Sequence, residues 1–481
     1  MDNKKKLLII GGGVSGLSAG IYALDNGFET TIIEKHSVAG GQCTGWTRKR
    51  TFIDGCAHWI VGTNEKSDLY PLWRHTGAIN DETVLYPTEY FSVFDVNGER
   101  VTFYADLKKL ESELTRVAPE DKAAIKRFIR GVKAYEHVKI PVRKPVAYMS
   151  VTELLSFGLK MFPMVFHLLK YKALSSEKYA CSFRSQILKE VFGRIINKEF
   201  NVHSLFYIMQ ALSENDAAMV GGGSKKLAER MSGEFVRRGG RLMLNAEARK
   251  IIVKNGKACG AELKNGEELI SDFVISSADA HHTLSVLLND KYDCGFLKSK
   301  FLKRKENPLI TCCFASFKVT ADMNGEPKML NFGISPIRVG STVFNDISVR
   351  NYSFDKTLND GATTFTVLMN LENDGYDYFN ALDKEEYEKE KARIGSEVRE
   401  EIKKYFNLSD DEITLIDFAT PKTYERYTNA YRGAYMSFMT TDKSRGLMCD
   451  GIVKGVKNFA MAGQWLMPPG GLPIALFTGK H

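Results

Sequence analysis

The amino-terminal run LLIIGGGVSGLSAGIYALDNGFETTIIEK, residues 7–35, constrains the fold more than any other part of the chain. A short apolar segment leads directly into Gly11, Gly13 and Gly16, which have the G-x-G-x-x-G spacing. In that spacing the first glycine permits a tight turn and the second lets the backbone approach a pyrophosphate. The third lets the following helix pack closely on the strand. The pattern predicts a strand, a phosphate-binding turn and a helix.

The residues after this turn complete a strand–helix–strand unit. Val14 and Ser15 open the predicted helix, whose first N–H groups are free to bind phosphate oxygens. Gly27 ends the helix, and a strand over residues 30–33 leads to Glu34, about twenty residues after the glycines. A carboxylate at that place can accept the ribose hydroxyls of an adenosine. We therefore expect an α/β fold of the Rossmann type.

Composition limits the remaining possibilities. The 481 residues suffice for two or three domains, and the net charge of +8 comes with no aromatic-rich basic motif, so we expect no nucleic-acid partner. Eight scattered cysteines without a C-x-x-C pair favour reduced thiols in a cytoplasm and predict no zinc site. The first apolar run is only four residues long, too short for a signal peptide, and no segment is apolar enough for a membrane span.

The next stretch, KHSVAGGQCTGWTRKRTFIDGCAHW, carries a second set of motifs. It resembles the superfamily of flavin-dependent phytoene desaturases, retinol saturases and amine oxidases. In that superfamily a Gly-Gly pair follows the ribose acid, and an "fdxGxH" run lies beside the flavin. The resemblance implies a glutathione reductase-like fold and a non-covalent FAD. It adds as FAD contacts Lys35, Gly40, Gly41, Gln42, Ala57 and His58. The family often has an arginine where this chain has Gln42.

Disulfide reductases offer a different interpretation of the same Gly-Gly pair. They place two redox cysteines after it, and Cys43 lies where the first would be. Arg48 occupies the second position, so the partner thiol is missing at that spacing and dithiol exchange is not expected as the main chemistry. The chain has no second G-x-G-x-x-G for a nicotinamide domain. The sequence therefore leaves the electron partner unidentified.

Residues 69–212 are mainly helical in pattern and predict a cap over the flavin domain. The most apolar part of this region is VTELLSFGLKMFPMVFHLLKYK, residues 151–172, where Lys160, Pro163 and His167 argue against a membrane crossing. This segment could line a substrate channel, lie in a membrane interface, or form a buried helix pair. A basic cluster at residues 298–305 similarly suits a solvated helix face or an anionic membrane surface.

The GGGSK run beginning at residue 221 lacks the phosphate-loop spacing and instead precedes a predicted helix over residues 225–238. By the same resemblance, the backbone near Ala248 brackets the adenine. Three strand patterns between residues 309 and 371 predict a mixed sheet that forms the floor of a substrate cavity. The adjacent His281 and His282 have no further ligands nearby in sequence, so we expect no metal there.

The last stretch, NFAMAGQWLMPPGGLPIALFTGK, resembles the family's "aG…pgGlp" segment, which closes over the ribityl chain. The resemblance implies contacts from Gly463, Gln464, Gly471, Leu472 and Pro473, with helix N–H groups near the flavin pyrimidine. Relatives often carry an acid at the position of Gln464. Their helix usually continues for several turns beyond the position of His481, so either the sequence is shortened here or this chain departs from the family in part of the clamp.

These observations predict a division into five segments. We expect an FAD-binding domain built from residues 1–68, 213–290 and 441–481, a helical cap at 69–212 and a mixed-sheet substrate domain at 291–440. The resemblance implies hydride transfer between flavin N5 and a carbon–carbon bond of a hydrophobic polyene, isoprenoid or lipid. His58, Trp59 and Tyr435 are candidate cavity residues. An amine oxidase, a redox-neutral isomerase and a non-catalytic flavin- or lipid-binding protein are the alternatives. The predicted location is cytoplasmic, with a possible membrane-surface association.

Overall fold

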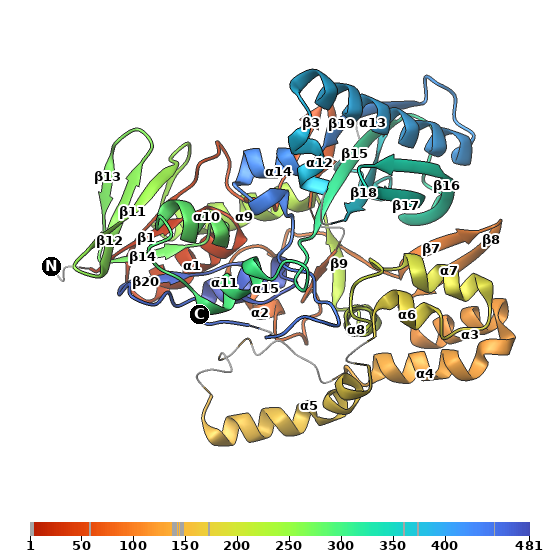
Figure 1. The fold of residues 1–481 in the computed structure, drawn as a ribbon, viewed down its shortest axis with the longest axis horizontal. Helices are drawn as coiled ribbons and strands as arrows, with labels where there is room; N and C mark the ends of the chain where they lie inside the picture. The colour runs from red at the N-terminus through yellow and green to blue at the C-terminus, as the bar shows by residue number, and fades with distance from the viewer. Residues whose placement is uncertain are drawn as a thin grey trace.

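The computed structural model of the protein describes residues 4–56, 59–136, 142, 144, 149–171, 174–358, 361–372, 375–446 and 448–481. A parallel sheet with its helices lies on one side of the molecule, and a larger mixed sheet lies on the other (Figure 1). A group of helices packs beneath the end of the mixed sheet, and one long helix, α5 (Val151–Tyr171), extends away from it (Figure 1). None of the described helices is long and apolar enough to cross a membrane.

The parallel sheet contains five strands assembled from three distant parts of the chain. In spatial order they are β10 (Arg241–Met243), β2 (Glu29–Ile33), β1 (Lys6–Ile10), β14 (Phe273–Ser276) and β20 (Phe459–Met461). Every neighbouring pair is parallel. The central strand β1 is a continuous apolar run because both of its faces are covered. The predicted Rossmann-type sheet is confirmed: β1 ends directly before Gly11 as expected, and β2 begins one residue before the predicted range of 30–33.

Small residues hold the helices of this domain together. Helix α1 (Val14–Asp25) packs against α15 (Leu472–Lys480) and α9 (Gly223–Arg237). A Cβ on Gly479 of α15 would lie only 2.3 Å from the backbone oxygen of Ser15. The hydroxyl of Ser18 donates to the backbone oxygen of Leu476 at 2.8 Å. The carboxy-terminal helix is therefore fixed directly against the helix that follows the glycine turn.

The mixed sheet has seven strands and one face covered by α13 (Lys384–Phe406). In spatial order the strands are β19 (Ile413–Ala419), β15 (Thr311–Val319), β18 (Thr363–Leu371), β17 (Thr342–Asn351), β16 (Met329–Val339), β7 (Tyr90–Val96) and β8 (Glu99–Tyr104). The strands β7 and β8 fall within residues 69–212, where the sequence pattern favoured helices. They add to the sheet formed by residues 311–419, so the cap segment and the sheet domain share one structure.

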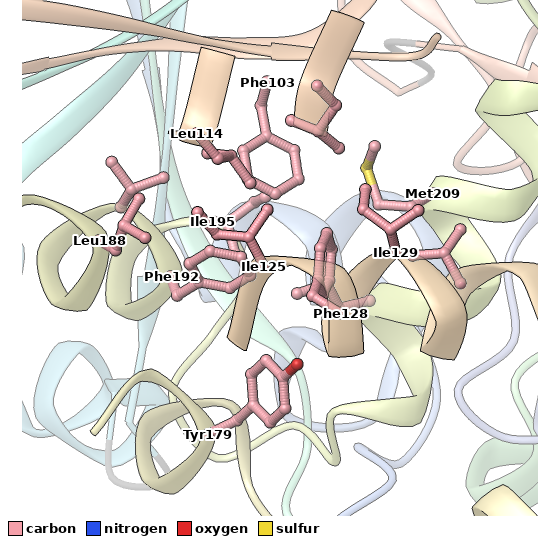
Figure 2. Packing of buried hydrophobic residues seen from close by; sticks show 14 of the residues in the cluster. Phe103, Leu114, Ile125, Phe128, Ile129, Tyr179, Leu188, Phe192, Ile195 and Met209 are labelled. Carbon is pink, nitrogen blue, oxygen red and sulfur yellow. The ribbon is translucent and has the colours of Figure 1, made fainter. Parts of the chain in front are cut away.

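The cap is built around a cluster of aromatic and aliphatic side chains (Figure 2). Phe103 of β8, Phe128 and Phe192 are each fully buried, and their rings meet edge to face with centroids 4.9–5.9 Å apart. The helices around this cluster are α3 (Leu107–Val117), α4 (Lys122–Lys133), α6 (Ser176–Ala180), α7 (Gln186–Arg194) and α8 (His203–Ser213). This rigid core positions α8 and the root of α5 beside the cavity described below.

Shorter elements connect these units. A hairpin of β3 (Gly45–Arg48) and β4 (Thr51–Asp54) follows the Gly-Gly pair. A three-stranded sheet contains β5 (Ile60–Val61), β9 (Ala217–Val220) and β6 (Leu85–Pro87), and another contains β11 (Ala248–Lys254), β12 (Lys257–Leu263) and β13 (Glu268–Ile270). The remaining helices are α2 (Tyr70–His75), α10 (Ala280–His282), α11 (Gly295–Leu302), α12 (Gly375–Ala381) and α14 (Pro421–Thr428).

Candidate functional site

The three glycines of the first turn have different structural roles. Gly11 has φ +101°, and a Cβ on Gly16 would lie 2.0 Å from the backbone oxygen of Gly11. The fold itself therefore requires both residues to be glycine. Gly13 has an ordinary φ of −74°, and a Cβ there would meet no protein atom closer than 3.8 Å. The space beside Gly13 is thus left open for a ligand, as the predicted pyrophosphate contact requires.

The amino end of α1 is equipped to bind an anion. Gly13 caps this twelve-residue helix without a side chain, so the N–H groups of its first turn face the cavity. The hydroxyl oxygen of Ser15 is buried and has no hydrogen-bond partner among the described residues. Because a buried polar group without a partner costs free energy, a ligand oxygen at this place would satisfy it. This end of the cavity fits the pyrophosphate of a dinucleotide.

Glu34 is fixed at the end of β2 by main-chain hydrogen bonds. It is only 7% exposed, and its two carboxylate oxygens accept N–H groups from Gly12 at 2.7 Å and His36 at 2.9 Å. Its side chain also lines the cavity, so further acceptor positions face a ligand. The neighbouring Lys35 turns its ammonium group to the side-chain oxygen of Asn429, at 2.6 Å. The carboxylate is therefore held ready for ribose hydroxyls.

The Gly-Gly pair lies directly on the glycine turn. The N–H of Gly40 donates to the oxygen of Gly12 at 2.8 Å, and both glycines of the pair have positive φ. The next residue, Gln42, meets Gln464 across the cavity, with an amide contact of 3.3 Å. Gln464 in turn accepts the N–H of Gly471, the residue that caps α15. Relatives often carry an arginine at position 42 and an acid at position 464. In this chain Gln42 and Gln464 occupy these positions and contact each other as a pair of neutral amides.

One cavity of about 1640 Å³ joins these motifs to the cap and the mixed sheet. It begins beside Glu34 and the glycine turn, passes the amino end of α15, and ends between α5, α8 and the strands β17 to β19. The wall at the far end is mainly apolar. It includes Phe91, Phe157, Met161, Met164, Ile196, Phe200, Tyr207 and Ile208. The predicted dinucleotide site and the predicted substrate cavity are thus a single continuous space.

Most of the residues proposed from the sequence line this cavity. They are Gly11, Gly13, Val14, Ser15, Glu34, Lys35, Gly40, Gly41, Gln42, Trp59, Ala248, Tyr435, Gly463, Gln464, Gly471, Leu472 and Pro473. Gly16 instead packs behind the turn, against Gly11 and Ser277. Ala57 and His58 lie outside the residues that the structure describes. The individual roles assigned to all these residues stay predictions.

The sheet side of the cavity carries polar groups within its apolar wall. Tyr435 donates its hydroxyl to the side-chain oxygen of Asn370 at 2.9 Å, and its ring lies 6.3 Å from that of Tyr424. Burial raises the pKa of both tyrosines well above the usual value, so both are neutral. Arg350 on β17 is only 7% exposed and lines the same space. No carboxylate among the described residues forms an ion pair with it.

Several cavity residues were missed by the sequence analysis. Asp279 follows β14 and accepts N–H groups from His282 at 2.9 Å and Tyr431 at 3.1 Å. Burial raises its pKa to about 6. Its place beyond the carboxyl end of a central parallel strand is a general signal for ligand contact, and this signal could have found it. Arg350 gave no such signal, because it is one arginine within an ordinary strand pattern.

The spacing expected for disulfide reductases leads to Arg48 and does not consider thiols elsewhere in the chain. The structure instead brings Cys56 near Cys43, where its thiol raises the pKa of Cys43. Both residues line the cavity, and all eight cysteines are free thiols in the structure. Across the described ranges, no group of three or more His, Cys, Asp or Glu side chains is arranged to hold a metal ion.

Comparisons with known proteins agree with this geometry. The profile of the family described as "Flavin containing amine oxidoreductase" matches residues 14–481. A neurosporene-forming phytoene desaturase from Rhodobacter capsulatus is 25% identical, over 99% of this chain and 92% of that protein. A chloroplastic prolycopene isomerase 1 from an Oncidium hybrid cultivar is 24% identical, over 89% of this chain and 74% of that protein.

Other alignments are shorter or more distant. The chain spans 56% of the length of a lycopene-forming phytoene desaturase from Paracoccus sp., to which it is 24% identical over 59% of its own length. Among solved structures, an oxidoreductase from Methanosarcina mazei has a TM-score of 0.61 with 15% identity, covering 98% of both chains. That similarity supports the fold described above.

Proposed function

Since the chain belongs to the family of flavin containing amine oxidoreductases, as we predicted, we propose that it holds FAD non-covalently and acts on a hydrophobic polyene. Membership makes it a flavin-dependent oxidoreductase. The proposed reaction moves a hydride between the flavin and a carbon–carbon bond of an isoprenoid or similar lipid. The names of the relatives, which include phytoene desaturases, support this substrate class.

One observation carries the proposal: the cavity is continuous from the dinucleotide cradle to an apolar chamber. A polar, solvent-borne substrate would need no such chamber, whereas a long apolar molecule needs a water-free wall along its length. Phe157, Met161 and Met164 bring that wall from α5, and Tyr207 and Ile208 bring it from α8. Methionine and aromatic side chains adapt well to an elongated apolar ligand.

The cofactor end has the donors and acceptors that FAD requires. The first turn of α1 and the hydroxyl of Ser15 would hold the pyrophosphate, and Glu34 would hold the adenosine ribose. Gly471, which caps the nine-residue helix α15, would set its helix dipole toward the flavin ring. When bound, FAD supplies the hydride acceptor or donor. No residue of the chain needs to form a covalent bond to it.

The remaining residues act by positioning and by excluding water. Hydride transfer to or from a carbon–carbon bond needs close alignment more than acid–base groups. Tyr435 is neutral and tied to Asn370, so it offers a fixed wall instead of a proton donor at neutral pH. The rigid aromatic cluster of the cap keeps α8 in place above the substrate. The chain thus positions the reacting bond and keeps water away from it.

Arg350 argues against a cationic amine as the substrate. A buried guanidinium on the cavity wall repels an ammonium group in a medium of low dielectric constant. The same group attracts a carboxylate or another oxygen-bearing end of a lipid. The aromatic pair Tyr424 and Tyr435 would suit an amine by shape, but its hydroxyls are occupied by Cys312 and Asn370. We therefore favour a lipid with a polar end over an amine.

The helix α5 supports delivery of the substrate from a membrane surface. Its apolar residues Val151, Leu155, Leu159 and Phe162 are 63–76% exposed and recur at helical spacing. Phe157 on another side of the same helix lines the cavity. An apolar stripe of this kind inserts into the headgroup boundary of a bilayer. We propose a cytoplasmic protein that rests on the membrane through α5 and takes its substrate there.

A redox-neutral isomerase is the second candidate, because the prolycopene isomerase aligns over 89% of this chain. The same cavity would hold a polyene beside a reduced flavin while one double bond changes geometry. Such an enzyme would require reductant and consume none. The two candidates share the cofactor and the substrate class and differ in net electron transfer.

The test uses purified protein loaded with FAD and a polyene lipid under anaerobic conditions. We expect a yellow protein whose flavin absorbance near the visible maximum bleaches or returns in step with a change in the number of double bonds in the lipid. A change in double-bond geometry without net electron transfer would favour the isomerase. Bleaching by putrescine with release of peroxide, and no response to lipids, would overturn the proposal.

A further inference from the structure

Two cysteines that are distant in sequence meet at the open end of the hairpin formed by β3 and β4. The last paired residues of the hairpin are Gly45 and Asp54, and main-chain hydrogen bonding continues one step further at 3.0 Å. This register places Cys43 opposite Cys56. Opposite residues of an antiparallel pair have Cα atoms about 4.5–5.5 Å apart, which is within the range of a disulfide. The Cys56 thiol lies near enough to be the largest cause that raises the pKa of Cys43.

The pair lies in the wall of the cofactor cavity. Cys43 lies two residues after the Gly-Gly pair and is 2% exposed, and its Sγ also contacts the backbone oxygen of Ser224 at 3.4 Å. Cys56 is half-buried, and both residues line the cavity. The residue between the Gly-Gly pair and Cys43 is Gln42, which contacts Gln464 beside the amino end of α15. Both thiols therefore line the cavity that the proposed FAD would occupy.

The other close pair of thiols provides a contrast. Cys294 and Cys449 have Sγ atoms 3.9 Å apart, but they lie in the cluster behind the parallel sheet and neither lines the cavity. The neighbouring Cys56 thiol and burial both raise the pKa of Cys43 well above its usual value. The buried member of the pair thus stays protonated at neutral pH, which keeps the reduced form intact.

We propose that Cys43 and Cys56 form a redox-active pair that exchanges two electrons with the bound flavin. When the pair is oxidised, both S–H bonds break and the Sγ–Sγ bond forms. Two electrons and one proton pass to the oxidised flavin, and the second proton passes to solvent. In the opposite direction, reduced flavin returns two electrons and a proton to the disulfide, and solvent supplies the other proton. An external dithiol or disulfide then completes the cycle by thiol–disulfide exchange.

This inference rests on the proposed flavin chemistry and gives it an electron partner. Exchange with an external thiol needs access to one sulfur, and the half-buried Cys56 provides it, whereas Cys43 is enclosed. The pair can exchange electrons with the flavin whether the enzyme saturates or desaturates its lipid. An external dithiol would supply electrons for saturation, and an external disulfide would remove them during desaturation.

The experiment counts electrons without using any lipid substrate. All proteins carry Cys449→Ser, which removes the other close thiol pair, and are loaded with FAD and mildly oxidised. Anaerobic titration with dithionite should consume four electrons per flavin in this background and two after Cys56→Ser. The matched control Cys181→Ser removes an exposed single thiol and should still consume four. Anaerobic dithiothreitol should bleach the flavin in the background protein and not in the Cys56 variant.

A second measurement does not depend on the folding of a variant. Peptide mapping of the unsubstituted holoprotein after oxidation should find a disulfide between residues 43 and 56, which disappears when the flavin is fully reduced. Two electrons per flavin in the background protein, or no such disulfide, would overturn the inference and leave the flavin assignment intact. A protein that binds no flavin at all would overturn the proposed function itself.

Discussion

The two ends of the cavity are built in different ways. At the cofactor end, the site is formed mainly by main-chain groups and glycines. Position 16 must be a glycine because its Cα lies against the backbone of Gly11, and Glu34 is held by two backbone N–H groups. At the substrate end, side chains from α5, α8 and three sheet strands make the wall, and few of them hydrogen-bond to one another. The first end is thus specified by local backbone geometry and the second by how distant elements pack.

This difference predicts which residues of the cavity tolerate substitution and which do not. A substitution in the glycine turn meets backbone atoms, which cannot move aside without disturbing β1 and α1. A substitution among Phe157, Met161 and Met164 meets the ends of flexible side chains, and the cavity can be reshaped with little loss of stability. We therefore expect the cofactor end to fix the chemistry and the apolar end to select the lipid.

The largest expected effect comes from the glycine turn. Gly16→Ala places a Cβ 2.0 Å from the backbone oxygen of Gly11 and should prevent the native packing of α1, so little soluble protein is expected. Gly13→Ala meets no protein atom closer than 3.8 Å and should fold normally. Its methyl group occupies the pyrophosphate space, so we expect at least a hundredfold loss of FAD affinity, which equals about 2.7 kcal/mol.

The measurements are thermal unfolding of the protein without flavin and fluorescence titration with FAD. Normal unfolding together with lost affinity in the Gly13 variant is the expected result. If Gly13→Ala binds FAD as tightly as the unsubstituted protein, the cofactor does not pass beside this residue. The glycine turn would then not be the part of the cavity that binds the cofactor.

The same contrast explains how far the sequence could be interpreted. The glycine spacing and Glu34 could be recognised because each requirement of the turn is met by one residue at a fixed separation along the chain. The parallel sheet followed from the strand–helix–strand unit that this turn implies. Tyr435 also lines the cavity, although its partner Asn370 could not be foreseen, because it comes from another strand.

Other features required knowledge of which strands are neighbours. Cys56 was overlooked because the search for a second thiol used a fixed spacing, whereas hairpin register brings it to Cys43. Arg350 reaches the cavity through the pairing of β17 with β18. The strands β7 and β8 were hidden in a helical region, since their place at the edge of the mixed sheet depends on contact with β16.

The second prediction tests the outer side of the apolar end. Leu159 and Phe162 of α5 are 76% and 70% exposed, so replacing both with glutamate should not disturb the fold. The double variant loses the apolar surface that would enter a bilayer, and we expect about a hundredfold weaker binding to anionic vesicles, or about 3 kcal/mol. The control is Ile270→Glu, which changes an exposed apolar residue on β13, outside both candidate membrane surfaces.

Vesicle sedimentation at fixed ionic strength measures this binding. Equal losses in the α5 variant and in the Ile270 control would indicate a general charge effect and remove the role assigned to α5. Unchanged binding in the α5 variant would place the membrane contact elsewhere. In either case the cofactor end, as measured by FAD affinity, should be the same as in the unsubstituted protein.

The third prediction concerns the electrostatics of the cofactor end. Burial raises the pKa of Asp279 to about 6, above the usual value of 3.8. Between these values the unfolded chain loses this proton while the folded protein keeps it, so a rise in pH from about 4 to about 6 lowers the stability. Relative to Asp279→Asn, the protein should lose about 3 kcal/mol across that range, at 1.36 kcal/mol per pKa unit.

Denaturant unfolding of both proteins at several pH values, without flavin, gives the difference directly. Taking the difference removes the contributions of the other carboxylates, because they are common to both proteins. The amide of the variant keeps an oxygen for the N–H groups of His282 and Tyr431. A difference that stays constant from pH 4 to pH 6 would mean that Asp279 has an ordinary pKa and is hydrated in the folded protein.

The smallest expected effect distinguishes among lipids at the apolar end. Arg350 is a buried cation on the wall of the cavity, and a carboxylate near it would gain a charge-assisted hydrogen bond. We expect Arg350→Met to lower the preference for a polyene acid over its own methyl ester about tenfold, measured as the ratio of the two kcat/KM values, or about 1.4 kcal/mol. Arg48→Met is the matched control, since Arg48 also lines the cavity but already pairs with Asp417.

The comparison of acid with ester is informative because the two molecules have the same apolar chain. A general disturbance of the cavity would reduce both kcat/KM values and leave their ratio unchanged, which would contradict a role for Arg350 in recognition. A lower ratio in the Arg350 variant alone would show that one charged side chain orients the lipid. The apolar wall would then set the length of the substrate, and Arg350 would set which of its carbon–carbon bonds reaches the flavin.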